Sequence, residues 1–240
     1  MHLKPATAFA AIGLAALSVV LYWTGAVPLA LEKQKSAAGK PAAASSAVPA
    51  SSGDFDFYVL ALSWSPSYCA SKGGSADQQQ CGIAKPLGFT AHGLWPQFER
   101  GFPQDCKIAR ENVSRDILRK IDPVMPSDGL ARHEWQKHGT CSGLSQADYF
   151  SALMQAVEKV RIPAMFNQPA SARRIAPSLV EAEFLKANPG MSAKGFAPVC
   201  GDGYLSEVRI CLTKDLNFRE CAEVDRKACR ANTIEMPPAR

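Results

Sequence analysis

The segment Phe55-Asp-Phe-Tyr-Val-Leu-Ala-Leu-Ser-Trp64 is apolar at almost every position. Successive side chains of a β-strand point to opposite faces of a sheet, so a strand formed here would be largely apolar on both faces. Such a strand is typical of the interior of a sheet, where both faces are covered. The segment therefore predicts a central strand around which the domain is built.

Further strands and helices are predicted on the C-terminal side of this strand. The apolar pattern predicts strands at residues 87–94, where Trp95-Pro96 would end the strand, and at residues 203–212. Capping residues and apolar periodicity predict helices at 114–121, 128–138, 145–160 and 178–188, capped by Ser114, Asp128, Ser145 and Ser178. This mixture predicts an α+β fold in which an antiparallel sheet has helices packed to one side.

The N-terminal segment differs in composition from the rest of the chain. Residues 1–31 contain Lys4 and then an apolar run over residues 6–31, which is typical of a signal peptide or of an uncleaved membrane anchor. The small residues of Thr24-Gly-Ala26 suit cleavage near Ala26. We therefore expect an exported protein, periplasmic or secreted, with anchoring through residues 6–31 as the alternative.

A linker and one folded domain are expected after this segment. Residues 32–52 are rich in Ala, Ser and Pro and contain no aromatic residue, which predicts a flexible linker. Residues 53–240 are long enough for one domain with a substantial core. The net charge is +5, of which +3 lies in residues 1–52, so the domain carries only about +2. A nucleic acid would therefore have to bind in a local cleft, because the domain has no broad basic surface.

All eight cysteines lie in the predicted domain, at Cys69, Cys81, Cys106, Cys141, Cys200, Cys211, Cys221 and Cys229. An even number of cysteines behind an export signal predicts four disulfides, although the sequence alone leaves about a hundred pairing schemes open. A cysteine metal site is disfavoured because no Cys-x-x-Cys pair occurs.

Three of the four histidines lie in two short segments, Thr90-Ala-His-Gly-Leu-Trp-Pro96 and His133-Glu-Trp-Gln-Lys-His138. If the second segment is helical, His133 and Lys137 lie about 40° apart on the helix, and so do Glu134 and His138. One helical face could then present two imidazoles, a carboxylate and an ammonium group.

Two other kinds of catalytic site fit these residues poorly. A zinc site built on one helix needs histidines four residues apart, whereas His133 and His138 are five apart and would point about 140° away from each other. A cysteine nucleophile needs a free thiol, which disulfide pairing would remove, and no Gly-x-Ser-x-Gly motif occurs for a serine nucleophile. No metal or other cofactor is therefore expected.

Paired imidazoles with a lysine and a glutamate favour acid–base chemistry on a phosphodiester. One histidine can remove a proton while the other supplies one, and a lysine can stabilise the charge that develops on phosphate oxygens. The ribose 2′-OH of RNA can then attack its own 3′-phosphodiester, so the enzyme needs neither a metal nor a nucleophile of its own. DNA lacks this hydroxyl and is not expected as a substrate.

Phe89-Thr-Ala-His-Gly-Leu-Trp-Pro96 and His133-Glu-Trp-Gln-Lys-His-Gly-Thr-Cys141 resemble the two active-site segments of the ribonuclease T2 family. Phe57-Tyr-Val-Leu-Ala-Leu-Ser-Trp-Ser-Pro66 also resembles the opening strand of that family. The similarity covers most of residues 54–230, and it is greatest to exported bacterial members such as periplasmic ribonuclease I. It implies an α+β fold and a metal-independent endoribonuclease that forms 2′,3′-cyclic phosphates and then, slowly, 3′-phosphates.

The resemblance also implies a role for each matching residue. His138 would be the general base and His92 the general acid, while Glu134 and Lys137 would stabilise the pentacovalent phosphorane. His133 and Trp95 would bind the substrate. Some family members carry an acidic residue after Trp-Pro that helps to read a base, whereas this chain has Gln97, so we expect little base specificity.

The disulfides that the resemblance implies are Cys69–Cys81, Cys106–Cys141, Cys200–Cys229 and Cys211–Cys221. A non-enzymatic protein that binds RNA or a protein partner is the alternative function, and it predicts damage to the catalytic set, which is intact. The sequence contains no sign of oligomerisation, so a monomer is expected.

Overall fold

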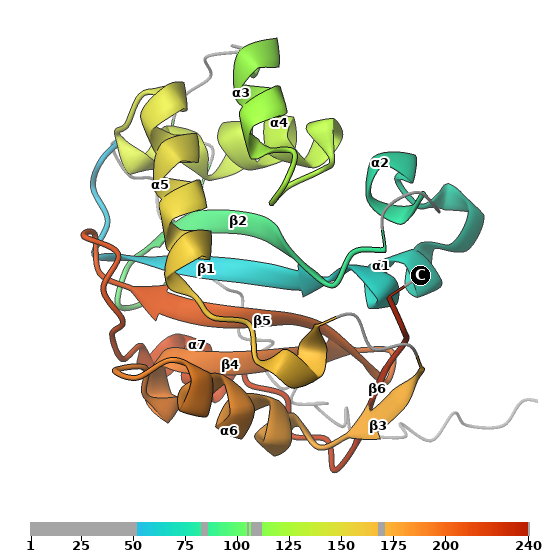
Figure 1. The fold of residues 1–240 in the computed structure, drawn as a ribbon. Coiled ribbons are helices and arrows are strands. Elements are labelled where there is room, and N and C mark those ends of the chain that lie inside the picture. The colour runs from blue at the N-terminus through green and yellow to red at the C-terminus, as the bar shows by residue number, and fades with distance from the viewer. Residues whose placement is uncertain (1–51, 83–85, 105, 107–111, 168–170, 240) are drawn as a thin grey trace, which may run out of the picture. The chain divides into compact units, whose positions relative to one another are not determined.

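The computed structural model describes residues 52–82, 86–104, 106, 112–167 and 171–239. The predicted signal peptide or anchor (1–31) lies outside these residues, as does nearly all of the predicted linker. Within the described ranges, no helix is both long enough and apolar enough to cross a membrane. The chain forms a six-stranded sheet surrounded by short and medium helices (Figure 1).

The strands are β1 (Phe57–Trp64), β2 (Phe89–Gln97), β3 (Arg173–Ile175), β4 (Phe196–Gly201), β5 (Tyr204–Leu212) and β6 (Ile234–Met236). Their order in the sheet is β2-β1-β5-β6-β3, and β4 also pairs with β5. All pairs are antiparallel except β5 with β6, which is parallel at a single residue pair. The predicted α+β fold is confirmed, and β1 lies inside the sheet as its sequence predicts.

The two faces of β1 contribute to two different cores. Tyr58, Leu60 and Leu62 belong to the main core, together with apolar residues from the longer helices. Phe57 and Val59 point to the opposite face and belong to a smaller cluster that includes Val224. The apolar residues on both faces of β1 are therefore accounted for by a large core on one side and a small one on the other.

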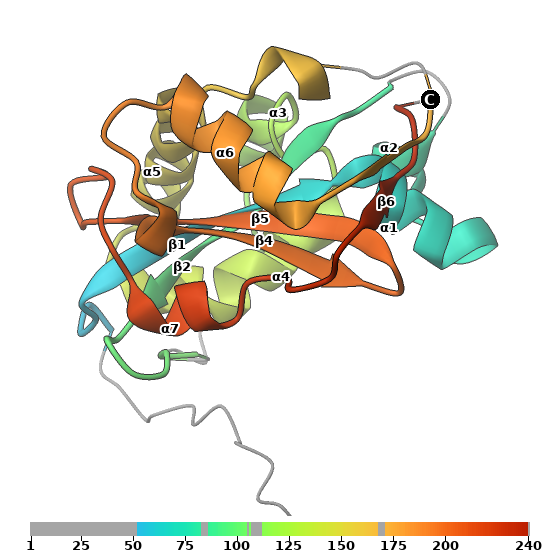
Figure 2. The same cartoon turned by 90° about the horizontal axis from the view of Figure 1, so that it is seen from below.

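The helices are α1 (Ser65–Lys72), α2 (Gln78–Cys81), α3 (Arg115–Ile121), α4 (Asp128–Lys137), α5 (Gln146–Lys159), α6 (Pro177–Ala187) and α7 (Ala222–Arg226). Helices α5 and α6 cover the main core, as the predicted grouping on one side requires (Figure 2). Helix α7 departs from that grouping and packs against the opposite face (Figure 2). It does so because Phe57 and Val59 would otherwise leave apolar surface exposed there.

Strand β2 is longer than its sequence predicts. It continues through Trp95 and Pro96 to Gln97, and Pro96 lies opposite Tyr58 of β1. Strand β2 is at the edge of the sheet, where a proline does not remove a hydrogen bond needed by a second neighbour. The expectation that Trp95-Pro96 ends the strand was therefore wrong, and Trp95 lies on the sheet itself.

Two of the four predicted helix caps are confirmed. Ser114 and Ser145 accept hydrogen bonds from the backbone N–H groups of Ile117 and Asp148, at the starts of α3 and α5. For α4 the cap is Ser127 rather than Asp128, which is the first residue of the helix. Helix α6 begins at Pro177 instead of being capped by Ser178, because proline is well suited to the first helical position.

Four disulfides cross-link the domain, and the described residues include no free cysteine. The linked pairs are Cys69–Cys81, Cys106–Cys141, Cys200–Cys229 and Cys211–Cys221. Cys141 is fully buried in a 3₁₀-helix (Gly139–Ser142) that directly follows α4. The second histidine segment is thus covalently fixed at its C-terminal end.

Candidate active site

A bulge in β2 places His92 on the face of the sheet that carries Trp95. Ala91 and Gly93 lie opposite adjacent residues of β1, so His92 is an extra residue in the strand. Ala91 is buried in the main core, whereas the His92 ring packs edge-on against Trp95, with 5.2 Å between ring centroids. In a regular strand, His92 and Trp95 are three positions apart and would point to opposite faces. The bulge therefore puts His92 and Trp95 on the same face of the sheet.

Helix α4 supplies the second half of the site. Glu134 lies on the buried side of α4, with 1% of its surface exposed, while His133 is exposed at the rim. The helix ends at Lys137, and His138 has non-helical backbone angles. The predicted common helical face thus holds for His133, Glu134 and Lys137, but His138 reaches the site because the helix ends just before it.

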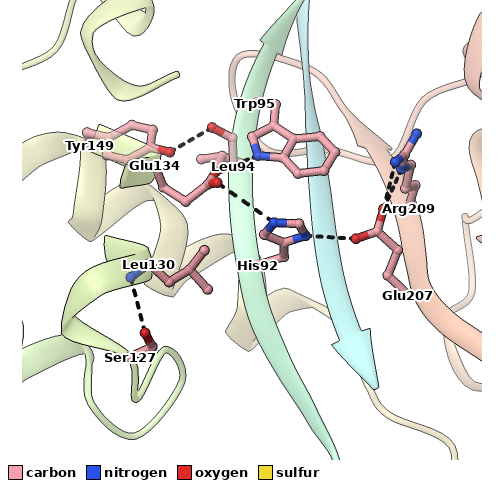
Figure 3. Close-up of polar contacts among 9 residues, drawn as sticks. All are labelled: His92, Leu94, Trp95, Ser127, Leu130, Glu134, Tyr149, Glu207 and Arg209. Carbon is pink, nitrogen blue, oxygen red and sulfur yellow. Dashed lines mark hydrogen bonds and ion pairs between the residues drawn. The ribbon is translucent and has the colours of Figure 1, made fainter. Parts of the chain in front are cut away.

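The indole of Trp95 connects the two segments. Its Nε1–H donates a hydrogen bond to Oε2 of Glu134 at 2.6 Å (Figure 3). The indole also lies next to both imidazoles, with its centroid 5.2 Å from that of His92 and 5.4 Å from that of His138. Trp95 therefore holds Glu134 in place and keeps the two histidines apart.

These side chains line one cleft of about 280 Å³. It contains every site residue that the sequence predicts, namely His92, Trp95, Gln97, His133, Glu134, Lys137 and His138. Further lining comes from Phe102, Arg209, Glu223 and Lys227. The two histidine segments, about 40 residues apart in the chain, thus meet at a single site.

His138 is held in its neutral form. Burial lowers its pKa to about 3, and the nearby positive charges of Lys137 and His133 act in the same direction. Its Nδ1 atom is buried and has no hydrogen-bond partner among the described residues. Protonation would therefore place a second N–H donor in a buried environment without an acceptor. A neutral imidazole can accept a proton, which is what a general base requires.

The surroundings of His92, unlike those of His138, favour the protonated form of the ring. Burial alone would lower its pKa, but the hydrogen bond and charge of Glu207, together with the charge of Glu134, raise it above its ordinary value. Its Nδ1 lies 2.8 Å from Oε2 of Glu207, and its Nε2 lies 3.8 Å from Oε1 of Glu134. A histidine that keeps its proton near neutral pH suits a general acid.

Glu134 responds chiefly to burial, which raises its pKa to about 7, although His92 and the indole hydrogen bond of Trp95 oppose this shift. The carboxyl group is therefore partly protonated near neutral pH. Since Oε2 accepts the indole hydrogen bond, Oε1 is the oxygen that faces His92.

Glu207 and Arg209 were not predicted from the sequence. Both lie on β5, and Arg209 donates to Oε1 of Glu207 through Nε at 2.8 Å and pairs with the same oxygen through Nη2 at 2.7 Å. The two residues alternate with the buried Val208 and Ile210, so they share the face of β5 that carries the site. Two opposite charges on one face of an otherwise apolar strand are the feature that could have identified them.

Among the described residues, no group of three or more His, Cys, Asp or Glu side chains is arranged to hold a metal ion. His133 and His138 both line the cleft, but His133 lies within α4, whereas His138 follows the end of the helix and has non-helical backbone angles.

Comparison with known proteins identifies related ribonucleases. The model of the ribonuclease T2 family matches residues 55–221. A ribonuclease from Aeromonas hydrophila is 40% identical over 177 residues, which cover 71% of this chain and 79% of that protein. Trichomaglin, an S-like ribonuclease of known structure, shares the fold with a TM-score of 0.61 at 20% identity, over 78% of this chain and all of that one. RNase NT in complex with 5′-AMP has a TM-score of 0.54 at 25% identity, over 77% of this chain and 99% of that one.

The fold is thus that of a ribonuclease. The chain belongs to the ribonuclease T2 family.

Proposed function

We propose that this protein is an endoribonuclease that cleaves single-stranded RNA without a metal or other cofactor. The reaction is a transphosphorylation that yields 2′,3′-cyclic phosphates, followed by slower hydrolysis to 3′-phosphates. The observation that carries this proposal is the contrast between the two histidines of one cleft. His138 is buried and neutral, whereas His92 is paired with carboxylates and has a raised pKa.

This contrast assigns the proton transfers. His138 takes the proton of the ribose 2′-OH while the 2′ oxygen attacks phosphorus. The bond between phosphorus and the 5′ oxygen breaks, and Nε2 of His92 donates a proton to the leaving 5′ oxygen. The two histidines exchange roles when water opens the cyclic phosphate. Because the pKa values of the two groups are moved in opposite directions, both are in the required form near neutral pH.

Glu134 and Lys137 stabilise the phosphorane. Below about pH 7 the Glu134 carboxyl group carries a proton, and Oε1 can donate it in a hydrogen bond to a phosphate oxygen. Lys137 lines the same cleft and supplies a positive charge.

Trp95, His133 and Gln97 form the substrate-binding part of the cleft. The exposed imidazole of His133 can hold a phosphate, and the indole of Trp95 provides an apolar surface for the sugar. The amide of Gln97 donates to the backbone oxygen of Pro96 at 2.8 Å and carries no charge, which supports low base specificity. The structure of RNase NT is a complex with the mononucleotide 5′-AMP, which supports a nucleotide-binding cleft in this chain as well.

The expected location follows from the cysteines and the N-terminal segment. All cysteines of the described domain form disulfides, which favours an oxidising compartment. Together with the apolar run of residues 6–31, this supports export to the periplasm or the medium, either free or anchored. We propose that the protein acts there as a monomer.

The proposal is tested with single substitutions in the oxidised protein. His92→Ala and His138→Ala should each lower RNA cleavage by at least about 1,000-fold, since acid–base groups contribute factors of this order. Gln136→Ala, at an exposed position of α4, is the matched control and should keep full activity. An RNA oligonucleotide that contains a single 2′-deoxy nucleotide should resist cleavage on the 3′ side of that nucleotide and should be cleaved normally at its other positions. Near-normal cleavage by either histidine variant would contradict the assigned roles.

A further inference from the structure

Glu207 contacts the predicted general acid from the side opposite Glu134. His92 lies between the two carboxylates, with Nδ1 facing Glu207 and Nε2 facing Glu134 (Figure 3). Glu207 is 115 residues away in the chain, on β5, where it lies opposite Ser63 of β1. It is buried, with 6% of its surface exposed. A buried glutamate requires partners, and its partners here are His92 and Arg209.

Arg209 keeps Glu207 ionised and leaves one of its oxygens for His92. Nε and Nη2 of Arg209 both approach Oε1, so Oε2 is the oxygen that accepts from the His92 ring. Burial alone would raise the pKa of Glu207, but the hydrogen bond of His92 and the charge of Arg209 lower it. The guanidinium of Arg209 is in turn positioned 5.3 Å from the indole centroid of Trp95.

The two carboxylates beside His92 therefore differ in charge near neutral pH. Glu134 has a raised pKa and is partly protonated, whereas Glu207 remains a carboxylate. The other charged or titratable groups that line this cleft are His133, Lys137 and His138 from α4 and its end, Arg209 from β5, Glu223 from α7 and Lys227 just after α7. Among the residues that the structure describes, Glu207 alone makes a side-chain hydrogen bond to the His92 ring.

We infer that Glu207 is a positioning residue for the general acid, because it accepts the Nδ1–H of His92 and so directs the protonated Nε2 toward the leaving oxygen. This inference rests on the proposed ribonuclease reaction. The hydrogen bond fixes both the orientation of the ring and its tautomer, and the carboxylate stabilises the imidazolium form. Arg209 acts indirectly, because it holds the carboxylate of Glu207 in position. Glu207 itself faces Nδ1, so it need not touch the reacting atoms.

The test compares two leaving groups in the Glu207→Gln protein. Glutamine has nearly the same shape and can still accept a hydrogen bond through its amide oxygen, but it removes the charge. One substrate is a dinucleotide, whose 5′ oxygen must be protonated as it leaves. The other is uridine 3′-(p-nitrophenyl phosphate), whose leaving group is stable as an anion and needs little help from an acid. Glu235→Gln, at an exposed position on β6, is the matched control.

Loss of general-acid function should reduce dinucleotide cleavage by about 10- to 100-fold and cleavage of the nitrophenyl ester by less than about 3-fold. The alkaline limb of the dinucleotide pH profile should also move to lower pH, because removing the negative charge makes His92 lose its proton more readily. Equal losses on both substrates, or an unmoved alkaline limb, would overturn the inference. If the wild-type protein cleaves neither substrate, the proposed function itself fails.

A second measurement does not depend on the variant folding. Nitrogen-15 NMR of the wild-type imidazoles reports which ring nitrogen carries the proton when His92 is neutral. The contact with Glu207 predicts the Nδ1–H form, with Nε2 unprotonated. A neutral His92 protonated at Nε2 would overturn the inference even if the Glu207→Gln protein did not fold.

Discussion

The carboxylate of Glu134 lies directly over the α-carbon of Gly93. A β-carbon at residue 93 would be 2.1 Å from Oε2 of Glu134 and 2.4 Å from Nε1 of Trp95. Neither neighbour can easily move away, because each is the hydrogen-bond partner of the other. The glycine that follows His92 is thus the point at which α4 approaches β2 closely enough for the site to form.

Gly93→Ala should therefore inactivate the enzyme while leaving the fold intact. The added methyl group must displace Glu134 and the indole of Trp95, and a displacement of about 1 Å in a catalytic group costs on the order of 100-fold in rate. We expect kcat/KM for RNA to fall at least about 100-fold and the free energy of unfolding to fall by about 1–3 kcal/mol. Gly74→Ala, where a β-carbon would meet nothing within 4 Å, is the control. Full activity of the Gly93→Ala protein would show that the close approach is unimportant.

Burial of neutral His138 should make the protein less stable in acid. The folded-state pKa is about 3, below the ordinary value near 6.5, so the unfolded chain binds a proton that the folded protein does not. The stability that results is present above about pH 6.5 and is lost as the pH falls toward 3. Wild-type protein should therefore lose about 3 kcal/mol from this group between pH 7 and pH 4.

Urea unfolding of the wild-type and His138→Asn proteins at both pH values isolates this effect. Asparagine does not titrate, so the stability advantage of the wild type over the variant should shrink by that amount at pH 4. Glu134 titrates in both proteins, and its contribution cancels in the comparison. An advantage that is the same at both pH values would mean that His138 is not held neutral by the fold.

Trp95→Phe should separate the hydrogen bond of the indole from its packing. The phenyl ring keeps an aromatic surface beside His92 and His138, but Glu134 loses the N–H donor that favours its ionised form. The pKa of Glu134 should rise further, and kcat should fall about 10-fold, with a smaller change in KM, because the carboxyl group is no longer held in place by the indole. The pH dependence of kcat checks this, and an unchanged rate would indicate that the indole N–H is dispensable. Trp135→Phe, outside the cleft, serves as the control.

The Cys106–Cys141 disulfide should matter more for activity than Cys69–Cys81. It closes a loop of 35 residues that leads from the first histidine segment to the end of the second, whereas Cys69 and Cys81 are only 12 apart. Replacing either pair with serine should cost about 3–4 kcal/mol of stability by loop entropy. Only loss of Cys106–Cys141 should also lower kcat/KM, because Cys141 lies three residues after His138. Equal activity of the two double variants would contradict this account.

The parts of the fold that were predicted from the sequence depend on local patterns. The nearly continuous apolar run of β1 is visible in eight consecutive residues, and the caps of α3 and α5 are single serine side chains that bond within the same turn. Each histidine segment contains its candidate catalytic side chains within a few residues. These side chains could therefore be named from the sequence, although their arrangement in space could not.

The parts that were missed depend on distant contacts. Nothing near His92 in the chain indicates the bulge, because the bulge is defined by how β2 pairs with β1. Glu207 is 115 residues away and becomes part of the site only through the order of the strands. The length of β2 was underestimated for a similar reason, since a proline is tolerated at Pro96 only because β2 is an edge strand.

The central claim is that two histidines catalyse attack by the substrate's own 2′-OH. The most direct test incubates the oxidised protein with RNA in excess EDTA and identifies the product ends by mass spectrometry. The account predicts rapid cleavage and, early in the reaction, fragments that end in 2′,3′-cyclic phosphates. Cleavage that stops in EDTA, or early products that end in 3′-hydroxyl groups, would contradict it.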